Sequence, residues 1–367
     1  MQHKYPFYLK STIVLFGLIL FVYTIFVLRE ILIPIAFSLM LAILLNPLSN
    51  WFSSKKVPKV ISIFLSLFIA FIVIAAIAYF LSSQVASFSD QWPLLKKRFA
   101  ELFSQLQVMM DQQLNINIEK QNEWIAQAES GMQPIIGQTL GTVFSSLALI
   151  FLLPVYTFLF MFYKSLILDF FYEVFGKNSK EVGVVLSQTK EAIQSYMVGL
   201  LIEALIVASL NSVALLILGV KYAILLGVLG AILNVLPYIG GIIAIAMPLI
   251  IATITKDGFQ TQLGIIGAYL VIQFIDNHFL IPYIVSSKVK INALISLIIV
   301  ILGGAVWGIS GMFLSIPTIA VLKIIFDRIP ELKPWGKLLG DEIPTRRKDE
   351  IWKRMRRKKP LSEKITT

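Results

Sequence analysis

Asp276, Asn277 and His278 stand side by side within the apolar stretch 263–285. A carboxylate, an amide and an imidazole together can bind a polar solute or an ion and can exchange protons. Within a membrane span each ionisable group costs at least about 2.5–3.5 kcal/mol, so such groups persist where they face a cavity or a partner. The triplet therefore predicts the pathway of a substrate or ion. The alternative is a polar clamp that ties two helices together through hydrogen bonds.

The geometry of a helix limits how this triplet can act. Asp276 and His278 are two residues apart, about 200° around an α-helix, so they do not face one groove. If the helix unwinds before Pro282, the three polar groups can line a common site. Glu203, within LLIEALIV, is the second acid in mid-span. A proton-coupled carrier needs such carboxylates, whereas a structural Glu203 would pair with a polar group on a neighbouring span.

Further candidates come from helix-breaking residues and amides near these acids. Asn234, Tyr238 and the two glycines that follow predict a mobile break near the site, or else a rigid kink filled by neighbouring side chains. The full set of predicted pathway residues is Glu203, Asn234, Pro237, Tyr238, Gly240, Gly241, Gln273, Asp276, Asn277 and His278.

The composition identifies a membrane protein. Of the 367 residues 57% are hydrophobic and 14% are charged, with a mean hydropathy of +0.82, whereas soluble domains are about 45–50% apolar and about 25% charged. Six apolar runs are long enough to cross a bilayer; they are residues 11–28, 31–48, 60–83, 139–163, 195–218 and 263–285. The first run lacks a cleavage site, so we interpret it as a retained anchor.

Two further apolar stretches, 222–255 and 291–326, are too long for simple spans. A straight helix of either length would be near 50 Å long, against about 30 Å for the hydrocarbon core. Each is therefore a long kinked helix or a re-entrant hairpin. The predicted fold is an all-α polytopic bundle of about eight hydrophobic spans, two of them broken.

The distribution of charge predicts the orientation and the organisation of the chain. Lysines near the N-terminus and in the 49–59 loop, and thirteen Lys or Arg against six Asp or Glu from residue 328 onward, place both termini in the cytoplasm. We predict four parts: 1–83 with three spans, 84–138 as an extracytoplasmic helical region, 139–328 as the transport core and 329–367 as a basic cytoplasmic tail. The tail is expected to bind anionic lipid headgroups rather than nucleic acid.

The predicted external region contains a heptad-like apolar stripe. Its residues are Leu95, Phe99, Leu102, Leu106 and Met109. A helix with this stripe packs either on its own transmembrane body or against another subunit of an oligomer, and the pattern fits both.

Three late motifs resemble the autoinducer-2 exporter family. They are the run from Asn234 to Gly241 (NVLPYIGG), the run from Gln273 to Pro282 (QFIDNHFLIP) and the glycine-rich run from Gly303 to Pro317. One departure is that Ala293, and not proline, follows Asn292. The resemblance implies a polytopic bacterial inner-membrane protein that forms a homo-oligomer. It also implies export of the quorum signal or exchange of sodium or lithium for protons.

Other chemistries find little support in the sequence. The chain has no cysteine, and it has no phosphate loop, nucleotide fingerprint or metal motif, so no cofactor is expected. The string GISG at 308–311 resembles the serine of intramembrane proteases, but here the serine follows His278 in chain order, opposite to that protease family. We predict a secondary-active transporter that exports a small polar solute, with autoinducer-2 as a candidate, and not an enzyme. The alternatives are a sodium (lithium)/proton antiporter and a membrane scaffold that binds envelope partners.

Overall fold

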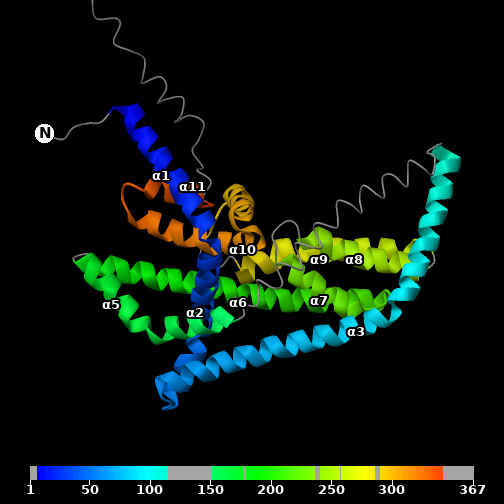
Figure 1. Cartoon of the computed structure of the whole chain (residues 1–367), viewed down its shortest axis with the longest axis horizontal. Helices are drawn as coiled ribbons and strands as arrows, with labels where there is room; N and C mark the ends of the chain where they lie inside the picture. Colours follow the sequence, from blue (N-terminus) through cyan, green and yellow to red (C-terminus); the bar gives the residue numbers. More distant parts are fainter. Residues whose placement is uncertain are drawn as a thin grey trace, which may run out of the picture.

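The computed structural model describes residues 6–114, 151–176, 179–235, 240–256, 258–285 and 290–341. The regular elements in these ranges are helices, and Figure 1 shows their arrangement. They are α1 (Phe7–Val27), α2 (Arg29–Ser54), α3 (Lys59–Leu114), a helix at Phe151–Phe162, α5 (Lys164–Phe175), α6 (Ser179–Ile217), α7 (Ala223–Asn234), α8 (Gly240–Thr255), α9 (Gln260–Ile275), the π-helix η2 (Asp276–Val285), α10 (Ala293–Arg328) and α11 (Lys333–Leu339).

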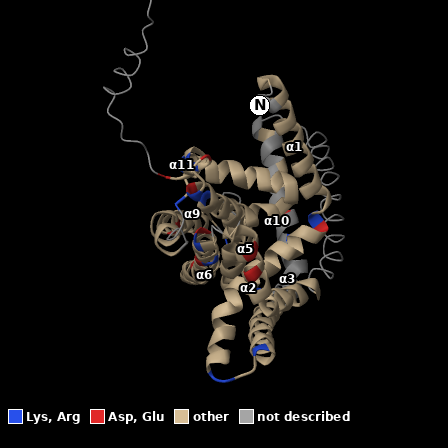
Figure 2. Cartoon of the chain, turned by 90° about the vertical axis from the view of Figure 1, so that its left-hand side faces the viewer, with Lys and Arg blue, Asp and Glu red and all other residues tan. Residues whose placement is uncertain are grey.

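The predicted polytopic helical bundle is confirmed. By length and composition alone, and with α10 taken as one helix, six helices among the described residues could cross a membrane. A seventh is added if the pair Phe151–Phe162 and Lys164–Phe175, bent by 59°, is one span. Apolar side chains are exposed along the whole of α1, as expected for a helix whose solvent is lipid. Figure 2 shows few charged residues along the helices and a basic turn after α2, where Lys55 and Lys56 lie.

The stretch 222–255 forms a helical hairpin and not one long kinked helix. Leu226 on α7 shares a buried apolar cluster with Ala244 and Ala252 on α8. At about 1.5 Å per residue, the 12 residues of α7 and the 16 residues of α8 reach about 18 and 24 Å. Both arms are shorter than the hydrocarbon core of about 30 Å, so neither arm is long enough to cross a membrane by itself.

α10 is also a hairpin, although its helical turns run nearly without interruption. The chain reverses at Trp307 and Gly308, and Gly308 has φ +60°, a left-handed conformation that glycine adopts without strain. After the reversal, Ser315 Oγ donates a hydrogen bond of 2.9 Å to the carbonyl oxygen of Ile299. The indole of Trp307 donates to the carbonyl oxygen of Ile25 at 3.0 Å, which connects the tip of this hairpin to α1.

α3 runs through the predicted division of the chain at residues 83 and 84, and the division itself stays a prediction. It continues as one helix for 56 residues, about 84 Å, through that boundary. Figure 1 shows its far end (cyan) standing apart from the other helices. The side chains of the apolar stripe at 95–109, residues 115–150 and the tail beyond residue 341 lie outside what the structure describes, so the packing of the stripe and the role of the tail remain predictions.

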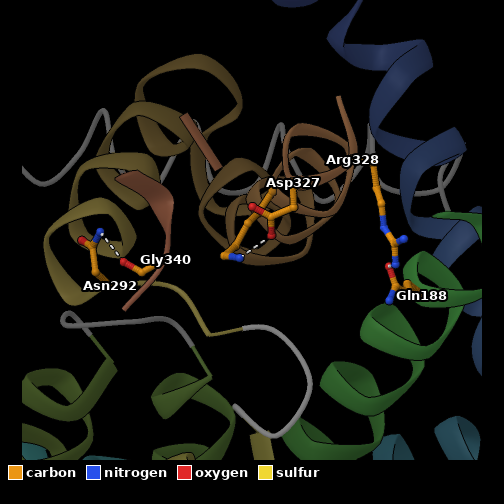
Figure 3. Close-up of polar contacts among 6 residues, drawn as sticks. Gln188, Asn292, Asp327, Arg328 and Gly340 are labelled. Atoms are coloured by element: carbon orange, nitrogen blue, oxygen red, sulfur yellow. Dashed lines mark hydrogen bonds and ion pairs between the residues drawn. The ribbon is translucent and has the colours of Figure 1, made fainter. Parts of the chain in front are cut away.

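Asn292 holds the start of α10 and the end of α11 together. Its Oδ1 accepts a hydrogen bond of 2.9 Å from the backbone N–H of Ile295, so the residue caps α10. Its Nδ2 donates to the carbonyl oxygens of Leu338, at 2.7 Å, and Gly340, at 3.1 Å. Figure 3 shows the bond to Gly340, together with the contact of Arg328 on α10 with Gln188 on α6. Ala293 is the first residue of α10, directly after this cap.

Replacing Asn292 by alanine is expected to destabilise this junction by about 1–2 kcal/mol, because the cap and the bonds to α11 are lost together. Asn292→Ser keeps a capping oxygen and loses the Nδ2 donor without placing a second acceptor against the two carbonyl oxygens, so its effect should be smaller. Melting temperatures in detergent would measure both. Equal melting temperatures for the wild type and Asn292→Ala would contradict the junction.

Candidate functional site

A cavity of about 1250 Å³ lies between α6, the α7–α8 hairpin, α9, η2 and the ends of α10 and α11. Its walls are mainly apolar, and it contains a small number of polar side chains. Six of the predicted pathway residues line it; they are Glu203, Asn234, Gly241, Gln273, Asp276 and Asn277. Sites for small solutes are commonly apolar cavities with a few polar groups that fix orientation. The cavity is therefore the candidate functional site.

Asp276 is the most buried acid of the cavity, with 1% of its surface exposed. It lies at the junction of α9 and η2, where the helix widens from α to π geometry, a change often found at functional sites. Asn234 Nδ2, at the end of α7, donates a hydrogen bond of 2.9 Å to Asp276 Oδ2. Gln273 Nε2 donates to the same oxygen at 3.5 Å. Two amides from two helices thus hold this carboxyl group.

Glu203 brings a second carboxyl group to the same point. It lies on α6 with 5% of its surface exposed, and its carboxyl group is within hydrogen-bonding reach of that of Asp276. Two ionised carboxylates at this distance repel, and neither can donate a hydrogen bond. One proton between the two groups replaces this repulsion with a hydrogen bond. The arrangement is thus suited to bind a single proton.

The structure does not bring His278 to this site. η2 keeps its helical form through Pro282, so Asp276 and His278 remain on different sides of it. The exposed imidazole of His278 stacks on the ring of Phe274, with centroids 4.3 Å apart. Its Nδ1 lies 3.0 Å from the carbonyl oxygen of Phe274, which can only accept, so Nδ1 is the donor. The contacts of His278 are with its own helix, while Asn277 lines the cavity.

The two glycines of the predicted break begin α8. Gly240 packs so closely against the last turn of α7 that a β-carbon there would overlap the carbonyl oxygen of Leu233. Gly241 lines the cavity, and a β-carbon on it would lie 3.0 Å from Gln273 Oε1. Pro237 and Tyr238 lie outside the described residues, so their role in the pathway remains a prediction.

Several polar residues of the cavity were not predicted, among them two tyrosines, a lysine and an aspartate. Tyr196 precedes Glu203 by seven residues, and Tyr269 precedes Asp276 by seven, so each tyrosine lies two helical turns from a carboxylate on nearly the same face. This spacing could have identified both from the sequence. Lys290 and Asp341 also line the cavity. They follow η2 and α11 in non-helical segments, and no periodicity indicates where such residues lie.

A polytopic helical bundle with ionisable groups at a cavity beside a helical hairpin is typical of one class of protein, the membrane transporters. Comparison with known proteins gives the same result. Residues 15–331 match the model of the AI-2E family transporter family. The chain is 24% identical to the YrrI protein of Bacillus subtilis (strain 168) over 308 residues, 82% of this chain and 86% of that protein. It is 23% identical to the AI-2 transport protein TqsA of Escherichia coli (strain K12) over 334 residues, 91% and 96% of the two chains.

The chain belongs to the AI-2E transporter family, which confirms the resemblance found in its three late motifs. It is an integral membrane protein with a small molecule or an ion as its substrate. Membership of a transporter family indicates transport rather than catalysis.

Proposed function

We propose that this protein is a proton-coupled secondary transporter that exports a small polar solute through the 1250 Å³ cavity. The observation on which this proposal rests is the contact between Glu203 and Asp276 at the cavity wall. Buried acids in membrane spans are expensive and are typical of proton relays and substrate paths. Two of them in contact, on α6 and η2, form a site whose charge changes by one when a proton binds.

The surroundings of the pair support coupling between the proton and the solute. Asn234 connects Asp276 to the end of α7, and Gly241 at the start of α8 lines the same cavity. A solute in the cavity therefore touches the hairpin that holds the carboxyl group. Broken helices at a binding site are the elements that move in many carriers. Movement of the hairpin would change the contacts of Asp276 and with them its hold on the proton.

The remaining features of the proposal follow from the sequence and the relatives. The distribution of Lys and Arg favours cytoplasmic N- and C-termini in the bacterial inner membrane. We also propose a homo-oligomer, and contact of the basic tail with anionic lipid. Autoinducer-2 is the first solute to test, because the relative TqsA is named an AI-2 transport protein. Sodium and lithium follow, as the substrates of an antiporter.

The experiment uses proteoliposomes that contain the purified protein and a pH-sensitive dye. Autoinducer-2, sodium or lithium is added outside in separate runs, and empty liposomes give the background. We expect proton movement in response to one of these solutes and not to the others. Proton movement only with sodium or lithium would favour antiport over export of the signal.

Absence of a response to every solute, with protein shown to be folded, would contradict the proposal. The scaffold alternative then gains support, and the long α3 would be the element to test for envelope partners. A solute flux without proton movement would leave a carrier but would remove the carboxyl pair from coupling.

A further inference from the structure

A second, much smaller pocket lies behind Asp276. Its volume is about 10 Å³, and it is enclosed by residues of α6, α7, α8, α9 and η2. It shares Asn234, Tyr269, Gln273 and Asp276 with the large cavity. Asn211 lines the small pocket and not the large cavity. A pocket needs a volume of about 10–15 Å³, measured in the same way, to hold one water molecule. The pocket is therefore of the size of a single water.

Three oxygen atoms of this pocket are buried without a hydrogen-bond partner. They are Oδ1 of Asn211, the hydroxyl oxygen of Tyr269 and Oδ1 of Asp276. The three residues have 2%, 7% and 1% of their surface exposed, so bulk solvent does not supply the missing partners. Buried polar groups without any hydrogen-bond partner are rare in folded proteins. Those that lack a partner in the protein are commonly hydrogen-bonded to an ordered water.

Gly230 on α7 keeps the space between these groups open. A β-carbon at Gly230 would lie 3.3 Å from Asn211 Nδ2, 3.7 Å from the Tyr269 hydroxyl oxygen and 3.4 Å from the β-carbon of Ala244. The side-chain amide of Asn211, with Nδ2 nearest, and the hydroxyl group of Tyr269 therefore approach the same point from α6 and α9. Any side chain larger than a hydrogen atom at position 230 would enter that space.

We infer that one water molecule occupies this pocket and joins Asn211 and Tyr269 to Asp276. The requirements of the pocket match the bonding capacity of water. Asn211 Oδ1 and Asp276 Oδ1 are acceptors, and each takes one of the two hydrogens of the water. The hydroxyl group of Tyr269 donates to the oxygen of the water. All three unpartnered groups are then satisfied by one molecule.

The water gives Asn211 and Tyr269 a role as positioning residues. Asp276 Oδ2 is held by Asn234 and Gln273, and the water holds Oδ1, so both carboxylate oxygens are fixed. The carboxyl group then keeps the orientation in which it meets Glu203. The water site itself rests on geometry, and its consequence for transport rests on the proposed function.

X-ray radiolytic labelling read by mass spectrometry tests the water directly, because a bound water that is ionised by X-rays oxidises the side chain beside it. Experiments in H₂¹⁸O distinguish a slowly exchanging bound water from bulk solvent in the large cavity. We expect Tyr269 of the wild type to be labelled by slowly exchanging oxygen. Gly230→Ala fills the pocket and should reduce this labelling several-fold. Gly267→Ala is the matched control, because no atom lies within 4 Å of its added β-carbon.

Equal slow labelling in the wild type and Gly230→Ala, or no slowly exchanging label at Tyr269, would overturn the inference. Slow labelling of Tyr269 that increases when choline replaces all sodium would also overturn the inference. A sodium ion would then occupy the pocket in the wild type, and water would enter only after the ion is removed. If Gly230→Ala does not fold, Asn211→Leu provides the same comparison, because it keeps the bulk and removes the acceptor.

Transport measurements on Asn211→Leu separate a positioning role from a structural one. Asn211 does not line the large cavity, so the solute concentration that gives half-maximal flux should not change. Maximal flux should fall several-fold because Asp276 loses its orientation. An unchanged maximal flux would show that the water does not position Asp276. Failure of wild-type transport would affect only this readout and leave the labelling test valid.

Discussion

Asp276→Asn is expected to reduce proton-coupled flux by on the order of 100-fold while the protein stays folded. Asparagine has nearly the shape of aspartate and can still accept the hydrogen bond from Asn234, but it cannot bind and release a proton. Loss of a positioned proton-transfer group typically reduces a rate by on the order of 100-fold or more. The measurement is dye-detected proton movement in proteoliposomes, with equal amounts of wild-type and variant protein.

The control for this prediction is Asp169→Asn. Asp169 is an exposed acid on α5 and does not line the cavity, so its neutralisation should leave flux unchanged. Near-wild-type flux in Asp276→Asn would show that this carboxylate has a structural role, as in the polar-clamp alternative. A variant that no longer elutes as a single species in detergent would be replaced by Asp276→Ser, which also lacks an ionisable group.

Gly240→Ala is expected to have the largest effect on stability. The added β-carbon would overlap the carbonyl oxygen of Leu233 and approach Asn234 Cα at 2.7 Å, and both of these are backbone atoms of α7. Overpacking typically costs about 1–3 kcal/mol, and more where backbone must move. The hairpin must therefore open, and Asn234 is then displaced from Asp276. The expected results are a lower melting temperature in detergent and loss of flux.

The same substitution at Gly267 on α9 is expected to have the opposite effect on the melting temperature. A β-carbon there meets no atom within 4 Å, and alanine is favoured over glycine in a helix by about 1 kcal/mol. Gly267→Ala should thus keep or raise the melting temperature. If both variants melt at the same temperature as the wild type, the close contact between α7 and α8 is wrong.

The spans and the two breaks in the long apolar stretches could be predicted because length and composition determine them. Apolar runs of 222–255 and 291–326 are too long for one crossing and contain glycines, which leaves a kink or a hairpin. The choice between these two depends on packing between residues distant in sequence, such as Ser315 with Ile299. No local pattern reports that contact. The continuation of α3 past residue 83 has a similar cause, because one apolar span and one polar helix join without a break.

The candidate site was predictable where a residue type is unusual for its surroundings. Glu203 and Asp276 stand out as acids in apolar spans, and the structure brings them into contact. Whether they carry a proton stays a prediction. His278 is equally unusual, yet it turns to the exposed side of η2 because the helix does not unwind before Pro282. Lys290 and Asp341 line the cavity through the end-to-end packing of α10 and α11, which the sequence does not indicate.

The most direct test of the carboxyl pair is a double-mutant cycle on proton flux with Glu203→Gln, Asp276→Asn and the double variant. If the two carboxyl groups bind one proton as a unit, the double variant should be no worse than Asp276→Asn alone. Independent groups instead give effects that multiply, so their energies add to within about 0.5 kcal/mol. Multiplying effects would contradict a shared proton, and wild-type proton flux in the double variant would contradict the whole account of coupling.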